Sequence, residues 1–204
     1  MEELGSPLHE KWYADKRDVV KWGTLVLLAR KHKLRTIIQV PFLREVRGSD
    51  NPILRSGRDA WPIPAEVWSH FRSIGGVTRL GRRCNLTIQV IPDVFRHHKR
   101  AKYVGRVIAA VRSQRGRKAV LLDPDTGIEP SRLTAEHVGC DEVTRVWQAL
   151  SRGDWLVLYQ HQRRAAGWLT EVQEKFARAC DAAPTRVFVS DSARDVAFVA
   201  AAKR

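Results

Sequence analysis

Short apolar runs that alternate with amphipathic stretches restrict the fold of this chain more than any other feature. The run at residues 119–122 (AVLL) is continuously apolar, which is typical of a parallel strand covered on both faces. The predicted strands cover residues 36–40, 86–91, 119–122, 155–159 and 187–190, and the predicted helices cover 18–32, 141–150, 169–179 and part of 96–118. This alternation predicts an α/β fold with a doubly wound, mostly parallel sheet and helices on both faces.

The last two apolar runs predict a change of strand direction. Only the short polar turn 191–195 separates residues 187–190 from 197–201, so we expect a C-terminal antiparallel hairpin. Residues 41–64 are rich in Pro and Gly and predict mostly loop, with a helix beginning near Ala65. No repeat or linker interrupts the pattern, so we expect one α/β domain over residues 1–204.

Positive charge is concentrated in one stretch of the chain. The net charge is +14, and residues 96–118 hold nine Lys or Arg and no Asp or Glu. Within this stretch the apolar and basic residues fall on opposite faces of a predicted helix. The basic candidates are Lys99, Arg100, Lys102 and Arg106, whereas Val104, Val107, Ile108 and Val111 face inward. The simplest alternative is a solvated basic face, but the absence of acids favours a nucleic-acid partner.

Other functional classes are disfavoured by composition. No stretch approaches the roughly 20 apolar residues of a membrane span, and residues 1–10 contain no apolar run, so we expect no membrane partner. Cys84, Cys140 and Cys180 show no CxxC spacing, which favours free thiols and a cytoplasmic location. The oligomeric state does not follow from the sequence.

Carboxylates follow one of the predicted central strands. Asp123, Asp125 and Glu129 lie within seven residues, and Pro124 stiffens the turn. Ligands of open parallel sheets bind outside the carboxyl ends of strands. The cluster could bind Mg²⁺ through oxygen ligands or accept hydrogen bonds from an exocyclic amine. The alternative is an ordinary turn, because Asp, Pro, Thr and Gly all favour turns.

A histidine and two arginines follow the next predicted strand. His161 could act as a general base or contact a phosphate, and Arg163 and Arg164 could supply charge for a polyanion. A structural histidine is the alternative. Asp18 and Lys21 share one face of the first predicted helix, where we expect a surface ion pair.

The familiar catalytic and nucleotide-binding motifs are missing. The sequence contains no GxxxxGK(S/T), no GxGxxG after a strand, no GxSxG and no HExxH. A phosphate cradle of the usual kind, a serine hydrolase and a zinc protease are therefore not expected.

Three blocks occur in order along the chain. They are YADKRDVVKWG at residues 13–23, LLDPDTGIE at 121–129 and LYQH at 158–161, with Arg163 and Arg164 following. The blocks resemble an uncharacterised bacterial group of the methyltransferase-like superfamily. The first block, in which Asp15, Asp18 and Lys21 form a DxxDxxK helix, is also similar to the opening of large-subunit rRNA adenine-N6 methyltransferases.

The resemblance implies a class I methyltransferase-like fold and the cofactor S-adenosylmethionine. Asp123 and Pro124 then stand where amino-methyltransferases carry Asp-Pro-Pro-Tyr, a motif that grips the target amine. Here Asp125 and Thr126 replace the second proline and the aromatic residue. Residues 41–44 (PFLR) follow the first predicted strand, where methyltransferases have a glycine-rich turn.

Three functions are consistent with these observations. The first is an S-adenosylmethionine-dependent amino-methyltransferase acting on RNA or DNA, with Asp123, Pro124, Asp125 and His161 as catalytic candidates. The second is a nuclease in which Asp123, Asp125 and Glu129 bind Mg²⁺ and His161 is the base. The third is a non-catalytic nucleic-acid-binding module.

Overall fold

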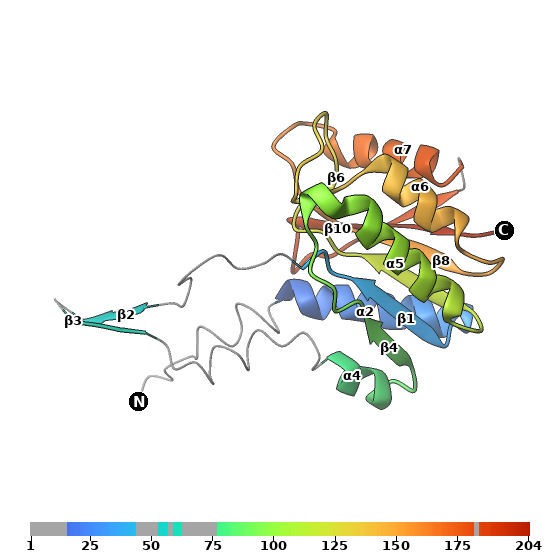
Figure 1. The fold of residues 1–204 in the computed structure, drawn as a ribbon, viewed down its shortest axis with the longest axis horizontal. Helices are drawn as coiled ribbons and strands as arrows, with labels where there is room; N and C mark the ends of the chain where they lie inside the picture. The colour runs from blue at the N-terminus through green and yellow to red at the C-terminus, as the bar shows by residue number, and fades with distance from the viewer. Residues whose placement is uncertain (1–15, 44–52, 57–58, 63–76, 182–183) are drawn as a thin grey trace.

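The computed structural model describes residues 16–43, 53–56, 59–62, 77–181 and 184–204. Its main element is a six-stranded sheet (Figure 1). The strands, in spatial order, are β4 (Thr87–Val90), β1 (Thr36–Val40), β5 (Lys118–Leu122), β8 (Trp155–His161), β10 (Val196–Ala202) and β9 (Thr185–Val189). The first four pair in parallel, and β10 is antiparallel to both of its neighbours. The predicted fold class is confirmed as Rossmann-like α/β, including the C-terminal hairpin.

Helices cover both faces of this sheet, as predicted. One face carries α2 (Lys16–His32) and α4 (Val77–Arg83), and the other carries α5 (Arg100–Ser113), α6 (Cys140–Gln148) and α7 (Trp168–Ala179) (Figure 1). Because strand side chains alternate between faces, Leu122 packs in the α5 core and Leu121 in the α2 core. The central strands therefore need apolar residues at nearly every position.

One apolar face of helix α2 packs against the sheet. Leu25 and Leu28 are buried in the core between α2 and the strands. Lys21 lies four residues before Leu25 and so falls on the same face of the helix. The helix face that buries Leu25 and Leu28 therefore also places Lys21 near the carboxyl ends of the strands.

Several short elements were not predicted. Strands β2 (Ile53–Ser56) and β3 (Asp59–Pro62) form an antiparallel hairpin where loop was expected. Helix α4, the 3-10 turn at His97–Lys99, and the two-residue strands β6 (Gly127–Ile128) and β7 (His137–Val138) were also missed. Such short elements depend on tertiary contacts rather than on periodicity. The helix expected near Ala65 lies outside the described residues.

Two further expectations concern the cysteines and membrane-spanning helices. The structure describes all three cysteines as free thiols. Among the described residues, no helix is both long and apolar enough to cross a membrane.

Candidate functional site

The candidate site lies where the connections of the sheet reverse direction. After β1 the chain crosses to β4 on one side, and after β5 it crosses to β8 on the other. The carboxyl ends of β1 and β5 therefore flank a topological switch point, the usual ligand position in open α/β sheets. Gln39 near the end of β1 and Asp123 directly after β5 meet here, with Gln39 Nε2 donating to Asp123 Oδ2 at 2.6 Å.

A buried lysine joins this pair from helix α2. Lys21 Nζ lies 3.1 Å from Asp123 Oδ2 and 2.9 Å from Asp18 Oδ1. Its side chain is only 11% exposed, and the ammonium group also lies 5.0 Å from the centre of the Tyr159 ring. We call Asp18, Lys21, Gln39 and Asp123 the switch-point cluster. The surface ion pair expected between Asp18 and Lys21 is thus part of a buried network that includes Asp123.

The electrostatics of the switch-point cluster keep the lysine charged. Burial alone would lower the pKa of Lys21, but Asp123 and Asp18 outweigh burial and raise the pKa above its ordinary value. Asp123 thus has a permanent cationic partner at neutral pH. Asp15, the remaining member of the expected helix motif, lies outside the described residues.

One acceptor in the switch-point cluster has no donor. Gln39 Oε1 is buried and makes no hydrogen bond within the structure. Its identity as oxygen follows from the opposite amide atom, because only the nitrogen can donate to the Asp123 carboxylate. A buried unsatisfied acceptor costs about 1–3 kcal/mol. The cluster therefore presents an acceptor suited to an N–H or O–H group of a ligand.

The loop after Asp123 is held by a buried glutamine. Gln160 is fully buried in β8, its Nε2 donates to Thr126 O at 2.8 Å, and its Oε1 accepts from Ile128 N at 3.0 Å. Gly127 has a φ of +115° and packs directly against this amide. Pro124 is buried, whereas Asp125 is exposed. The turn is therefore built as a fixed support for Asp123.

His161 ends β8 on the same face of the sheet as Tyr159. The two rings are 5.0 Å apart and nearly perpendicular. Burial and then the charge of Arg17 lower the pKa of His161, while Asp195 and Asp123 oppose this shift. The lowered pKa favours the neutral imidazole, which is the form that can act as a base. Both Gln160 and His161 were expected beyond the strand, but β8 runs two residues further than predicted.

The expected metal ligands are not brought together. Glu129 Oε1 accepts a hydrogen bond from Cys140 N at 2.8 Å, at the start of α6, and Asp123 is bonded to Lys21 and Gln39. The described part of the chain contains no group of three or more His, Cys, Asp and Glu side chains arranged to hold a metal ion.

The resemblance implies an S-adenosylmethionine cradle at the residues that follow β1. Pro41 and Phe42 are buried, and the Phe42 ring packs 5.2 Å from Phe95 and 5.3 Å from Tyr103. Phe42 N–H donates to Tyr103 Oη at 3.2 Å, and the Phe42 φ is +49°. Aromatic packing thus occupies the segment where the resemblance implies a glycine-rich turn. Residues 41–43 do not fit that cradle.

The predicted nucleic-acid-binding residues fall into two groups. The members of the first group are bonded to other parts of the protein. Arg100 binds Glu142 together with two backbone carbonyls, Arg106 pairs with Asp93 at 2.9 Å, and Arg163 binds Ile128 O and Glu171.

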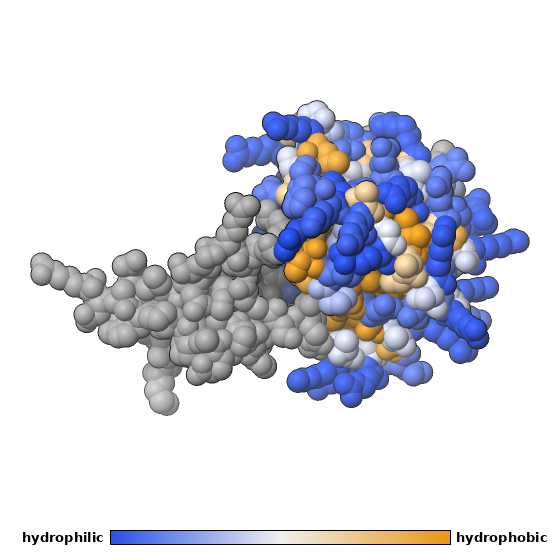
Figure 2. Space-filling model, viewed as in Figure 1, coloured by the Kyte–Doolittle hydropathy of each residue, from blue (hydrophilic) through white to orange (hydrophobic). Residues whose placement is uncertain are grey.

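Exposed cations make up the second group. Lys99, Lys102 and Arg164 are exposed, and no ion pair forms with them inside the described ranges. Hydrophilic side chains dominate the face that carries α5, α6 and α7 (Figure 2). Among the predicted contacts in residues 96–118, Lys99 and Lys102 therefore remain available to an external anion.

Comparison with known proteins adds no relative. No protein-family model matches the chain, and no curated protein or solved structure is significantly similar to it. The fold and the site together define a class, a Rossmann-like α/β protein with a buried charged cluster at its switch point.

Proposed function

We propose that this chain binds nucleic acid and holds an exocyclic base amine at Gln39 and Asp123. The observation that carries the proposal is Gln39 Oε1, which is buried beside a carboxylate at the switch point and accepts no hydrogen bond from the described residues. An amine offers two hydrogens. Gln39 Oε1 accepts one, and Asp123 accepts the other because a carboxylate has about four lone-pair sites. Lys21 Nζ lies 3.1 Å from Asp123 Oδ2, and a carboxylate paired with a cation offers only acceptors to a ligand.

Charge supports a polyanionic partner for the same chain. The net charge is +14. Lys99, in the turn before α5, and Lys102, near the start of α5, are exposed and form no ion pair within the described part of the chain. Such cations contribute sequence-independent affinity through phosphate contacts. The base amine would supply the selective part of recognition.

The amine contact is tested with base analogues. Binding of labelled single-stranded oligonucleotides is measured by fluorescence anisotropy, with adenine replaced by purine or guanine by hypoxanthine to remove the amine. We expect tenfold weaker binding for one of these replacements, corresponding to about 1.4 kcal/mol. The Gln39→Met variant should lose this discrimination while retaining general affinity. Equal binding of both analogues by the unmodified chain would overturn a contact with a purine amine.

The phosphate contacts are tested by salt dependence. Lys99→Ala/Lys102→Ala should reduce the slope of log affinity against log salt by about 1.4–1.8, since each lost contact removes about 0.7–0.9. Arg82→Ala/Arg83→Ala, which removes two exposed arginines of α4, is the charge-matched control. Equal losses in the two variants would contradict a defined phosphate contact at the start of α5.

Amino-methyl transfer is the second candidate, and it requires an S-adenosylmethionine site other than the glycine-rich cradle that residues 41–43 do not fit. Its support is the resemblance together with the reversed strand β10 between β8 and β9, which agrees with a methyltransferase sheet. A thermal melt with S-adenosylmethionine tests it, because a ligand at 100 times its dissociation constant adds about 2.7 kcal/mol. A rise of several degrees supports this activity. An unchanged melt leaves a binding module, and the same melt with Mg²⁺ tests the nuclease alternative.

A further inference from the structure

A pocket lies at the edge of the sheet opposite to Asp123. It has a volume of about 680 Å³, a size typical of small-molecule sites. Its walls come from the end of α2, the segments that precede β5 and β8, strand β9 and the residues after β10. The parallel strands begin at this edge, so the switch-point cluster lies at the other end of the sheet.

The lining of this pocket is strongly cationic. Arg117, Arg152, Arg186, Lys203 and Arg204 line it, and no Asp or Glu is among the lining residues. Within the described residues none of the five forms an ion pair. Mutual repulsion of cations gathered in one place is relieved by an anion. The pocket therefore favours a ligand with several negative charges.

The buried carboxylate of Asp154 does not neutralise these cations. Asp154 adjoins the lining residues Gly153 and Trp155, but its Oδ2 pairs with Lys118 Nζ at 2.8 Å and accepts from Ser151 N at 2.9 Å. Its Oδ1 accepts from Lys118 N at 3.1 Å. Both Asp154 oxygens are therefore bonded to Lys118 or Ser151. Asp154 does not compensate the positive charge of the five lining cations.

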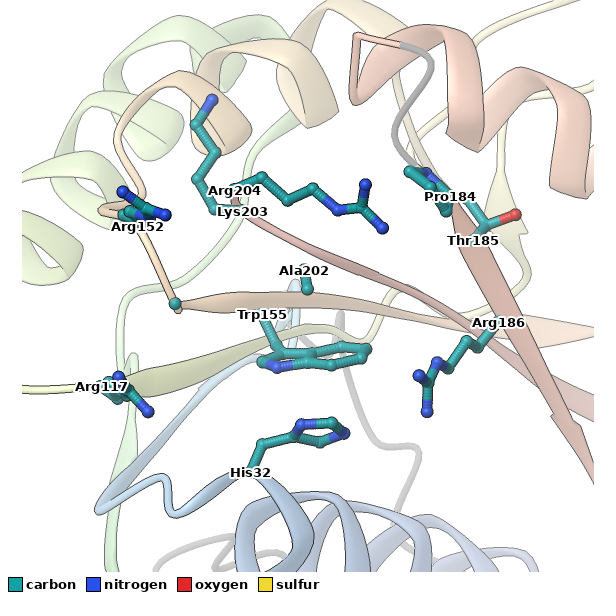
Figure 3. Close-up of a pocket in the computed structure, with 11 residues that line it drawn as sticks. His32, Arg117, Arg152, Trp155, Pro184, Thr185, Arg186, Ala202, Lys203 and Arg204 are labelled. Atoms are coloured by element: carbon teal, nitrogen blue, oxygen red, sulfur yellow. The ribbon is translucent and has the colours of Figure 1, made fainter.

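Aromatic rings form the floor of the pocket. The His32 and Trp155 ring centres are 4.3 Å apart, and the Arg186 guanidinium lies 5.6 Å from the Trp155 ring. Figure 3 shows Arg186 to one side of Trp155, Arg117 and Arg152 to the other, Arg204 above the Trp155 ring and His32 beneath it. His32 Nε2 is buried and makes no hydrogen bond within the structure. An unsatisfied ring nitrogen thus adjoins the cations.

We propose that this pocket binds a phosphate chain, as carried by a nucleoside triphosphate or by inorganic polyphosphate. Arginine guanidinium groups bind phosphate oxygens through paired hydrogen bonds, and the cations on both sides of Trp155 match an extended polyanion better than a single phosphate. A phosphate oxygen would give His32 Nε2 the hydrogen-bond partner that it lacks. In a nucleoside triphosphate, the base would pack against the His32 and Trp155 rings.

Calorimetric titration of the full chain in 0.15 M KCl tests this site with ATP, tripolyphosphate and adenosine. We expect one ATP and one tripolyphosphate to bind per chain, and adenosine alone not to bind. Tighter binding of ATP than of tripolyphosphate assigns the site to a nucleotide, and equal affinity assigns it to the phosphate chain alone. Absence of saturable binding by both phosphate compounds would overturn the proposal.

Variants separate the pocket from the general charge of the protein. Arg117→Ala/Arg186→Ala should weaken ATP binding at least tenfold, whereas Arg82→Ala/Arg83→Ala, with the same loss of charge, should not. Equal weakening in both would show attraction to a basic surface and would refute the site. Lys99→Ala/Lys102→Ala should retain ATP binding, so this test is independent of the nucleic-acid proposal.

A spectroscopic signature reports on the pocket directly. Burial first, and then Arg186 and Lys31, lower the pKa of His32. A bound phosphate chain opposes this shift, so the NMR-monitored pKa of the His32 ring should rise on addition of tripolyphosphate. An unchanged His32 titration at saturating ligand would place the anion elsewhere and contradict the proposal.

Discussion

Gly127 and Gln160 illustrate how single residues build the switch-point edge. The backbone of Gly127 adopts the left-handed region, and an added Cβ would lie 2.0 Å from Gln160 Oε1. The same Gln160 amide holds the backbone on both sides of that glycine. A side chain at Gly127 would therefore displace the glutamine and release the loop that begins at Asp123.

Gly127→Ala should consequently destabilise the protein by about 3 kcal/mol or more, since strain and loss of buried hydrogen bonds combine. Urea unfolding measures this change. Gly105→Ala is the matched control, because Gly105 lies in helix α5 with open space around it. That variant should be stabilised by about 0.5–1 kcal/mol. A similar effect of the two alanines would contradict the packing of Gly127 against Gln160.

Lys21 stabilises the same edge of the sheet through its positive charge. Lys21→Met removes the ammonium group that pairs with Asp18 and Asp123 and should cost about 3 kcal/mol at pH 7. Because the folded-state pKa of Lys21 is raised, its stabilisation is complete below the unfolded-state pKa of about 10.4 and is lost only as pH rises above that value. The difference between the two proteins should therefore stay constant from pH 7 to 9.

Lys31→Met is the control for this experiment. Lys31 is exposed near the end of the same helix, so its replacement should change the free energy of unfolding by less than about 0.5 kcal/mol. A Lys21→Met protein as stable as the unmodified chain would show that the switch-point cluster contributes no net stability.

Elements in this fold are joined by a few buried ion pairs. Arg100, at the start of α5, binds both oxygens of Glu142 in α6 at 2.8 and 2.6 Å. It also donates to Thr134 O at 3.0 Å and to His137 O at 2.7 Å. One guanidinium thus links two helices and the segment between β6 and α6. The sequence had suggested Arg100 as a nucleic-acid contact, yet its donors are directed into the protein.

Arg100→Met should destabilise the protein by about 3–5 kcal/mol, the range for breaking a buried pair on one side. Arg100→Lys should recover only part of this loss, because an ammonium group cannot reproduce the two-pronged contact with a carboxylate. Chemical unfolding measures both changes. Lys102→Ala, two residues along the same helix and exposed, should be nearly neutral. Full stability of Arg100→Met would rule out the proposed link between the helices.

The whole molecule carries a large unbalanced charge. A net charge of +14 on 204 residues disfavours the compact state through self-repulsion, which salt screens over about 10 Å at 0.1 M. Raising KCl from 0.02 to 0.3 M should therefore raise the melting temperature by about 2–4 °C, equivalent to about 1 kcal/mol. Sucrose at equal osmolality is the control for non-ionic effects. A melting temperature that falls with KCl would mean that attractive ion pairs outweigh the repulsion.

The architecture could be predicted because it is encoded by local pattern. Strand β1 occupies the predicted residues 36–40, and β5 begins one residue earlier than expected. Apolar runs can be buried only in a sheet covered on both faces, and the short turn before β10 leaves no room for a crossover. Asp123 was likewise predicted, since any residue directly after a central parallel strand lies at the ligand-binding edge.

Tertiary structure alone decided how the polar residues are used. The sequence identified Arg100, Arg163 and Glu129 as functional candidates, but each is bonded within the fold because its neighbours in space come from distant segments. Gln39 gave no signal, since a lone polar residue in a strand pattern does not reveal its partner. Strand order brings Gln39 to Asp123, and crossovers bring five cations to one pocket. Periodicity records which face a residue occupies, whereas long-range pairing determines what it meets there.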